Sequence, residues 1–382
     1  MEDDFDTMNL SAEELIKLYY GSVNSESGEI PEDETHKAFA YLITAADKGL
    51  PEAWAELGAC YFAGIGVDQD EASALDYLEK AALRNVANAQ MNLYSLMWGK
   101  AQTDEEKKNA LYWLNQAAAN KVPSALYEMG NHYYHGMAFE QDYKKAVEYF
   151  TLSAEAECSE AMAMLGVMYQ QGQGVEKNPE KSVEWFVDAA EAGSLTGLCN
   201  LGCAYMGGLG VKQDYEEAKN CFLGLTDLED PFIEMPDLNN VKTRSDIAQV
   251  YLQNQAYIIT YPLAHHNLGI MYQHGLGDEA DEKKALYHFM LAAENDYAPS
   301  CLQAGAILYA GDAMGKPEPE KAFDYLTTAL NAGIPEAKLF LGMMYYGGEG
   351  VAQDKEKGIA YLDELIAAGN VQAIQIKNNL LS

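Results

Sequence analysis

The chain has 382 residues, of which 25 are lysine or arginine and 59 are aspartate or glutamate, giving a formal net charge of −34. A field of this sign repels nucleic acids and anionic membrane surfaces and favours basic partners, although it is equally explained as a charge that keeps a long protein soluble. A single globular core rarely grows to this length, so a repeat architecture or several domains are expected.

No segment of the sequence suits export or membrane insertion. The N-terminal stretch MEDDFDTMNLSAEE is acidic and lacks the apolar segment of a signal peptide, and no apolar run of about 18 residues occurs. We therefore expect a cytoplasmic protein. Reduced thiols are expected as well, because the cysteines follow no period; they are Cys60, Cys158, Cys199, Cys203, Cys221 and Cys301.

The first helix is expected to begin at Ser11, after a flexible acidic segment over residues 1–10. Glu14 follows Ser11 by three residues, which is the spacing of a capping box. Tyrosines end this helix, and the segment SVNSESGEIPED then makes a long loop to the second helix. Residues 11–52 are thus predicted to form an imperfect first pair of helices.

The stretch 161–196 shows the repeating unit most clearly. Its first half places apolar residues on one face of a helix, and Gly166 on that helix lets a neighbouring helix approach closely. Gly172 and Gly174 end the helix, because glycine adopts a positive φ without strain. Asn178, which precedes a proline, is expected to cap a second helix. Each unit is therefore predicted to be two short antiparallel helices.

The unit returns every 36 or 37 residues, apart from one longer interval. A helix pair of this kind cannot bury its apolar face alone, so stacking into one solenoid over residues 11–382 is predicted. The expected repeats are 11–52, 53–88, 89–124, 125–160, 161–196, 197–263, 264–300, 301–336 and 337–372, followed by a C-terminal capping helix over 373–382.

Two positions recur within the repeats. A tyrosine near the end of the first helix is expected to lie in the core, as Tyr61, Tyr133, Tyr169, Tyr205, Tyr272, Tyr309 and Tyr345. An aspartate or asparagine is expected to cap the second helix, as Asp70, Asp142, Asn178, Asp214, Asp281 and Asp354.

Two repeats depart from the pattern. The third has Tyr94 at the position of the helix glycine and KAQT in place of the glycine turn. The sixth contains an insertion over 227–262, which starts with an acidic, proline-broken stretch and is expected to form an additional helix from Asn240 to about Tyr257. Two interpretations of the insertion are open: a tolerated excursion over the solenoid surface, or a partner contact or lid.

The blocks LGACYFAGIGV, LGVMYQQGQGV, LGCAYMGGLGV and LGMMYYGGEGV resemble Sel-1-like repeats, which are relatives of tetratricopeptide repeats. The resemblance covers roughly Ser11 to Gln372. It implies an all-α, right-handed α-solenoid of about nine two-helix repeats with a capping helix. It also implies adaptor, scaffold or inhibitor roles without a shared catalytic site.

By analogy with tetratricopeptide repeats, a partner is expected on the concave face, at first-helix positions between the core positions. Aromatic, methionine and amide side chains dominate these positions and lysine and arginine are missing, which favours an apolar, amide-rich or basic segment of another protein. The predicted lining residues are Met91, Asn92, Trp98, Tyr127, Glu128, Asn131, Tyr134, Met164, Asn200, Met206, His266, Asn267, Phe340 and Tyr346.

We expect a monomeric, non-catalytic scaffold or adaptor. The alternative is an acidic inhibitor or immunity-type protein that neutralises a basic toxin or enzyme, with the net charge speeding association. No catalytic residue, metal ligand or cofactor site is predicted, because the histidines match no H-E-x-x-H spacing and Cys199 with Cys203 lacks a second pair. His132 and His288 occupy positions typical of the core.

Overall fold

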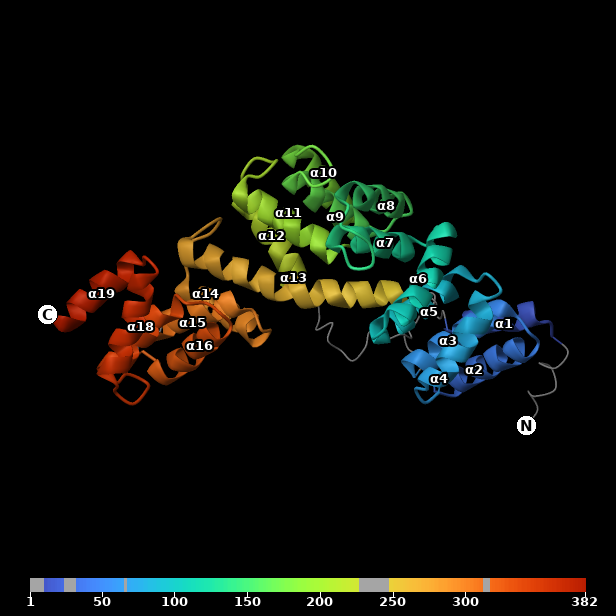
Figure 1. The fold of residues 1–382 in the computed structure, drawn as a ribbon, viewed down its shortest axis with the longest axis horizontal. Coiled ribbons are helices and arrows are strands. Elements are labelled where there is room, and N and C mark those ends of the chain that lie inside the picture. The colour runs from blue at the N-terminus through green and yellow to red at the C-terminus, as the bar shows by residue number, and fades with distance from the viewer. Residues whose placement is uncertain (1–9, 24–31, 65–66, 227–246, 312–316) are drawn as a thin grey trace. The chain divides into compact units, whose positions relative to one another are not determined.

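The computed structural model describes residues 10–23, 32–64, 67–226, 247–311 and 317–382, and within these residues every regular element is a helix (Figure 1). This confirms the all-α class. The helices are α1 (Ala12–Val23), α2 (Glu32–Asp47), α3 (Pro51–Ala63), α4 (Glu71–Ala82), α5 (Ala87–Lys100), α6 (Asp104–Ala119), α7 (Pro123–His135), α8 (Tyr143–Glu155), α9 (Ser159–Gln171), α10 (Pro179–Glu191), α11 (Leu195–Gly207), α12 (Tyr215–Thr226), α13 (Ile247–His274), α14 (Glu282–Glu294), α15 (Ala298–Ala310), α16 (Pro319–Asn331), α17 (Ala337–Gly347), α18 (Lys355–Ala367) and α19 (Val371–Leu381).

Consecutive helices pack as the predicted pairs α1–α2, α3–α4, α5–α6, α7–α8, α9–α10, α15–α16 and α17–α18. The second helices α2, α4, α6, α8, α14, α16 and α18 also contact the helix that follows each of them. All six predicted caps are confirmed, since each Asp or Asn side chain accepts a hydrogen bond from a backbone N–H of the first turn of the second helix. Ser11 and Glu14 form the predicted capping box at α1, with Ser11 N donating to Glu14 Oε2 at 2.7 Å. In the third repeat, a capping box of Thr103 and Glu106 starts α6 where the glycine turn is missing.

The predicted close approach at Gly166 is confirmed. A Cβ atom at this position would lie 2.4 Å from Cε1 of Phe186, whose ring on α10 is fully buried. The same contact recurs between Gly130 and Phe150 on α7 and α8. The absent side chain is therefore what allows an aromatic ring to fill the space between the two helices of a repeat.

A second glycine fixes how one repeat meets the preceding one. Gly174 has φ of 72°, and a Cβ atom there would lie 2.3 Å from the backbone oxygen of Tyr143, at the start of the preceding second helix α8. Only glycine combines the left-handed conformation with this approach.

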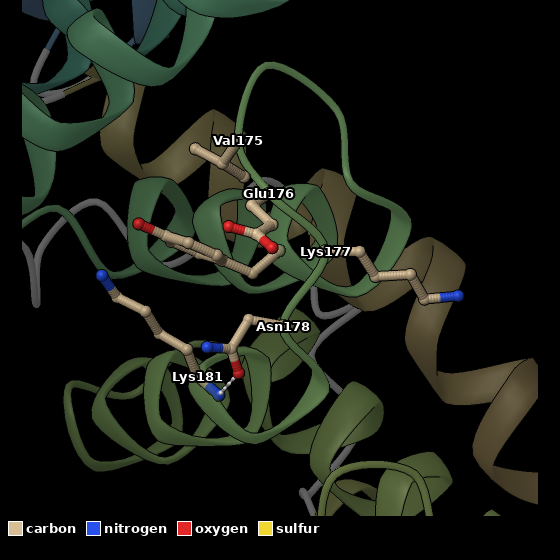
Figure 2. A pocket seen from close by; sticks show the side chains of 6 residues that line it. Val175, Glu176, Lys177, Asn178 and Lys181 are labelled. Atoms are coloured by element: carbon tan, nitrogen blue, oxygen red, sulfur yellow. Dashed lines mark hydrogen bonds between the residues drawn. The ribbon is translucent and has the colours of Figure 1, made fainter.

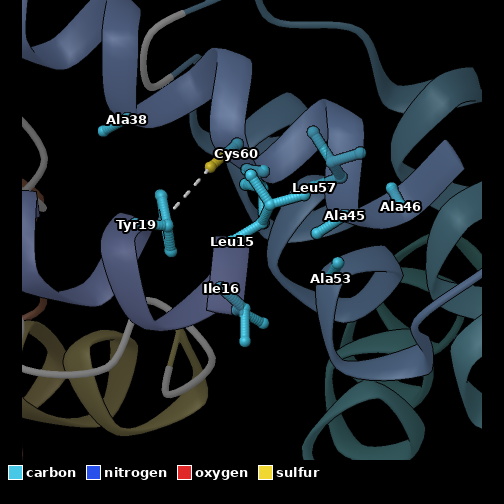
Figure 3. Close-up of a cluster of buried hydrophobic side chains, with 10 residues drawn as sticks. Leu15, Ile16, Tyr19, Ala38, Ala45, Ala46, Ala53, Leu57 and Cys60 are labelled. Carbon is cyan, nitrogen blue, oxygen red and sulfur yellow. Dashed lines mark hydrogen bonds between the residues drawn. The ribbon is translucent and has the colours of Figure 1, made fainter. Parts of the chain in front are cut away.

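The core forms between helices of each repeat and of its neighbours. At the N-terminal end, one cluster joins α1, α2 and α3, in which Leu15 and Leu57 are buried and the Tyr19 hydroxyl lies 3.9 Å from Cys60 Sγ (Figure 3). Cys60 thus lies on the core face of its helix. None of the six cysteines, all of which the structure describes, forms a disulfide.

The prediction that the recurring tyrosines lie in the core is wrong for six of the seven. Only Tyr272 is buried, at 8% exposed, whereas the others are half-buried. The ring of Tyr133, for example, packs against the core clusters as a partly buried side chain rather than inside them. It stacks on Tyr149 of the adjoining helix, and the ammonium group of Lys145 lies 4.9 Å from the ring centre.

The insertion also differs from its prediction. Residues 227–246 lie outside the described part of the chain, and so does the predicted helix start at Asn240. From Ile247 the chain forms one continuous helix, α13, that runs through Pro262 and includes the first helix of the next repeat. The predicted additional helix and the helix starting near Ala264 are therefore a single element of 28 residues.

The chain divides into two compact units, one of Met1–Gly197 with Glu229–Ala256 and the other of Leu198–Leu228 with Tyr257–Ser382. The single continuous solenoid stays a prediction. At the C-terminal end, α19 packs against α17 and α18 with Ala373 fully buried, and Asn370 caps it. Among the described residues, no helix is both long and apolar enough to cross a membrane.

Candidate functional site

The predicted lining residues fall in both units. We call the partly exposed surface of the odd-numbered helices α5, α7 and α9 the first-helix face of unit 1. Eleven of the fourteen predicted residues are half-buried and present some surface: Trp98, Tyr127, Glu128, Asn131, Tyr134 and Met164 in unit 1, and Asn200, Met206, His266, Phe340 and Tyr346 in unit 2.

The other three predicted lining residues are buried and offer a partner almost no surface. Met91 is 3% exposed and belongs to the core between α5, α6 and α7, and Asn92 beside it is 4% exposed. Asn267 is 6% exposed, and its Nδ2 donates to Cys203 Sγ at 3.6 Å. A first helix packed against helices on several sides leaves only a narrow exposed stripe, which helical spacing alone did not resolve.

Glu128 carries the most perturbed carboxyl group of the first-helix face of unit 1. Burial raises its pKa to about 7, and only a long hydrogen bond from Asn131 Nδ2, 3.5 Å from Oε1, opposes this shift. The carboxyl also raises the pKa of the Tyr94 hydroxyl, for which burial is the larger cause. Glu128 forms no ion pair with a described lysine or arginine. It is thus a carboxyl group held partly out of water without a cation.

One repeat further along the chain, Glu160 on α9 is also half-buried. Its Oε1 accepts a hydrogen bond from Ser194 Oγ at 2.6 Å, and burial raises the pKa of its carboxyl group. The Tyr127 hydroxyl is affected by both carboxyl groups. Burial is the largest cause of its raised pKa, and the charges of Glu160 and Glu128 raise the pKa further. Tyr127 packs on the Phe150 ring, with centroids 5.6 Å apart. Contact with Phe150 therefore holds the Tyr127 ring in place.

An aromatic cluster continues this face on α5. The Tyr94 hydroxyl lies 2.8 Å from His132 Nε2, and the Trp98 ring meets His132 edge-on with centroids 4.6 Å apart. Burial lowers the pKa of His132 to about 4, so the imidazole is neutral near pH 7. The irregular Tyr94 of the third repeat thus has a structural role: it occupies the glycine position and bonds to the next repeat.

In unit 2 the histidines contact one another and the core. His265 Nδ1 lies 2.8 Å from His288 Nδ1, and the His288 ring stacks on Tyr272. His266 Nδ1 lies 2.7 Å from Ser300 Oγ. In the described part of the chain, no three His, Cys, Asp or Glu side chains are grouped so as to hold a metal ion. The arrangement is that of bonded core histidines, as predicted for His288.

The sequence reasoning missed the pairing of tyrosine with lysine on the other side of the repeats. Lys145, Lys181 and Lys357 occupy the same repeat position, and each ammonium group lies 4.0–4.9 Å from the ring centre of the recurring tyrosine. The recurrence of lysine at this repeat position is the feature of the sequence that indicates the pairing. Beside Tyr169 and Lys181 is a depression of about 480 Å³, which Figure 2 shows with Glu176 over it and Lys177 pointing away. The charged side chains around this depression are exposed and of both signs, so they favour no particular class of ligand.

The sequence model of the Sel1 repeat matches nine segments: residues 18–50, 51–86, 82–122, 123–158, 159–194, 196–223, 262–297, 298–334 and 335–370. The chain also resembles two solved structures. One is a protective antigen present in uropathogenic Escherichia coli strains that displays an SLR fold, with 26% identity, a TM-score of 0.50 and coverage of 95% of this chain and 78% of that one. The other is a Sel1 repeat protein from Oxalobacter formigenes, with 23% identity, a TM-score of 0.55 and coverage of 94% and 95%.

Proposed function

Because the chain belongs to the Sel1 repeat family, whose members generally mediate protein–protein interactions, we propose that it is a non-catalytic adaptor that holds a segment of a partner protein on the first-helix face of unit 1. The observation that carries the proposal is the Glu128 carboxyl, which is partly buried with no described cation beside it. A lysine or arginine of the partner would complete it.

The surroundings of Glu128 support a partner that combines a cation with apolar groups. Tyr127, Trp98 and Met164 offer apolar area of the kind that anchors interfaces, and the Asn131 amide can bond a peptide backbone. The net charge of −34 would attract a basic partner from a distance, which is also what the inhibitor alternative requires. Salt dependence distinguishes the adaptor from the inhibitor. Added salt screens the attraction by net charge, and it screens contact with a half-buried carboxyl less.

We expect Glu128→Gln to weaken partner binding about tenfold or more, because it removes one member of a desolvated charge pair. The matched control is Glu155→Gln, which makes the same change on an exposed residue of α8. The partner is first recovered from a lysate of the source organism, identified by mass spectrometry and purified; each variant is then titrated calorimetrically. Equal affinities for the two variants would contradict the proposal.

The same titration tests the protonation state. Because the free carboxyl has a pKa of about 7 and the bound partner cation favours the ionised form, affinity is expected to rise from about pH 6 to about pH 8 in the parent and not in Glu128→Gln. A small basic partner lost at high salt would favour the inhibitor role. A salt-resistant complex would favour the adaptor.

A further inference from the structure

Three of the six cysteines lie together in unit 2. Cys199 and Cys203 are one turn apart on α11, and Cys221 of α12 packs beside them, its Cβ 3.0 Å from where a side chain on Gly202 would begin. Cys199 and Cys221 are buried, at 2% and 8% exposed, whereas Cys203 is half-buried. Cys203 is therefore the least buried of the three cysteines.

Two side chains lie against the Cys203 sulfur. The Asn267 amide of α13 donates a hydrogen bond from Nδ2 at 3.6 Å, and the Cys199 thiol lies one turn earlier on α11. Donors aimed at a sulfur stabilise its thiolate, and here they lower the pKa of Cys203 while that of Cys199 is raised well above its usual value. The other titratable groups facing this pair are Cys221 and Tyr297 at the start of α15.

We propose that Cys203 is the oxidisable thiol of this protein and that its oxidant is a hydroperoxide. The thiolate sulfur attacks the distal peroxide oxygen, an S–O bond forms as the O–O bond breaks, and the leaving hydroxide or alkoxide takes a proton from water. The sulfur loses two electrons and the peroxide gains them, which gives a sulfenic acid.

The sulfenic acid is not expected to proceed to a disulfide with Cys199. Residues four apart on a helix hold their Cβ atoms about 5–6 Å apart, which exceeds the spacing of about 3.5–4.5 Å that a disulfide needs. Cys203 occupies the same repeat position as Asn131, two repeats later. An effect of its oxidation on partner binding would rest on the proposed function; its reactivity does not.

The chain contains its own control. Cys158 is half-buried like Cys203, but burial raises its pKa. The reduced full-length protein is exposed to limiting hydrogen peroxide with dimedone at about pH 7.5, and labelling of each cysteine is followed by peptide mass spectrometry. Cys203 is expected to be labelled several times faster than Cys158, because its lowered pKa leaves more of Cys203 as thiolate and the raised pKa of Cys158 leaves less. Equal labelling, or faster labelling of Cys158, would overturn the proposal.

Two variants test the cause. Asn267→Leu removes the amide donor and Cys199→Ala removes the thiol donor, and each is expected to slow Cys203 labelling and to raise the midpoint of its iodoacetamide alkylation against pH. Labelling of Cys158, in the other unit, should stay at the parent rate and reports intact folding there. Parent-like reactivity of Cys203 in both variants would show that the two donors do not activate it. Partner binding by the reduced protein is measured separately, so failure of the binding proposal would not contradict the proposed reactivity of Cys203.

Discussion

Phe186→Ala is expected to lower the free energy of unfolding by about 3–5 kcal/mol, which is the usual cost of removing a fully buried ring. The ring fills the space that Gly166 leaves between α9 and α10, and no neighbouring side chain can occupy it without moving. Because repeats unfold partly independently, urea unfolding is combined with hydrogen exchange of the α9 and α10 amides. Exchange should accelerate most in these two helices.

Gly166→Ala provides the companion measurement. In the parent, the added methyl group meets the Phe186 ring, and overpacking of about 1–3 kcal/mol should exceed the gain of about 1 kcal/mol in helix propensity. In the Phe186→Ala background the methyl group has room, and the same change should be neutral or stabilising. If Gly166→Ala has the same effect in both backgrounds, the close contact does not explain the glycine.

Acid is expected to destabilise the protein before its surface carboxylates protonate. Burial lowers the pKa of His132, His265, His266 and His288 to about 4, below the value of 6.5 for an exposed histidine. The unfolded chain therefore binds more protons, so the stability that these groups contribute is complete above about pH 6.5 and is lost as the pH falls toward about 4. The raised pKa of Glu128 has the opposite effect: protonation of its carboxyl group stabilises the folded protein as the pH falls from about 7 to 4.5.

For His132 alone, the expected loss between about pH 7.5 and 5.0 is about 2 kcal/mol, measured as the change in free energy of urea unfolding. The control is the double variant Tyr94→Phe/His132→Met, because the equivalent residue of the next repeat is the buried Met168 and the phenylalanine leaves no unpaired hydroxyl. This variant should lose about 2 kcal/mol less than the parent over the same range. An unchanged pH dependence would mean that His132 is not a buried neutral base.

Local chemistry accounts for the features that could be predicted from the sequence. The Asp and Asn caps depend on residues within one turn, and the recurrence of the pattern indicated both the helix pairs and the close approach at Gly166. The confirmed cap at Asp354 and the contact between Gly166 and Phe186 follow from that recurrence.

The features that could not be predicted depend on neighbours outside the repeat pattern. Tyr133 is half-buried rather than buried because it packs against the core clusters from outside, beside Lys145 of the second helix. Asn267 is buried because its amide turns to the Cys203 sulfur. The insertion was expected to end at residue 262, before a separate first helix, but α13 continues through Pro262. Among the predicted lining residues, helical spacing identified the side of the helix and not the depth of each residue.

The contact of Gly174 with the Tyr143 backbone bears on how such a chain can change its length. Gly350 makes the same kind of approach to Pro319, so the seam between successive repeats is built alike in both units. A gain or loss of one whole 36-residue period would rejoin equivalent backbone positions, whereas a deletion of another length inside a repeat such as 161–196 would leave its glycine turn facing a different residue. A change in the number of whole repeats therefore preserves the contact between neighbouring repeats.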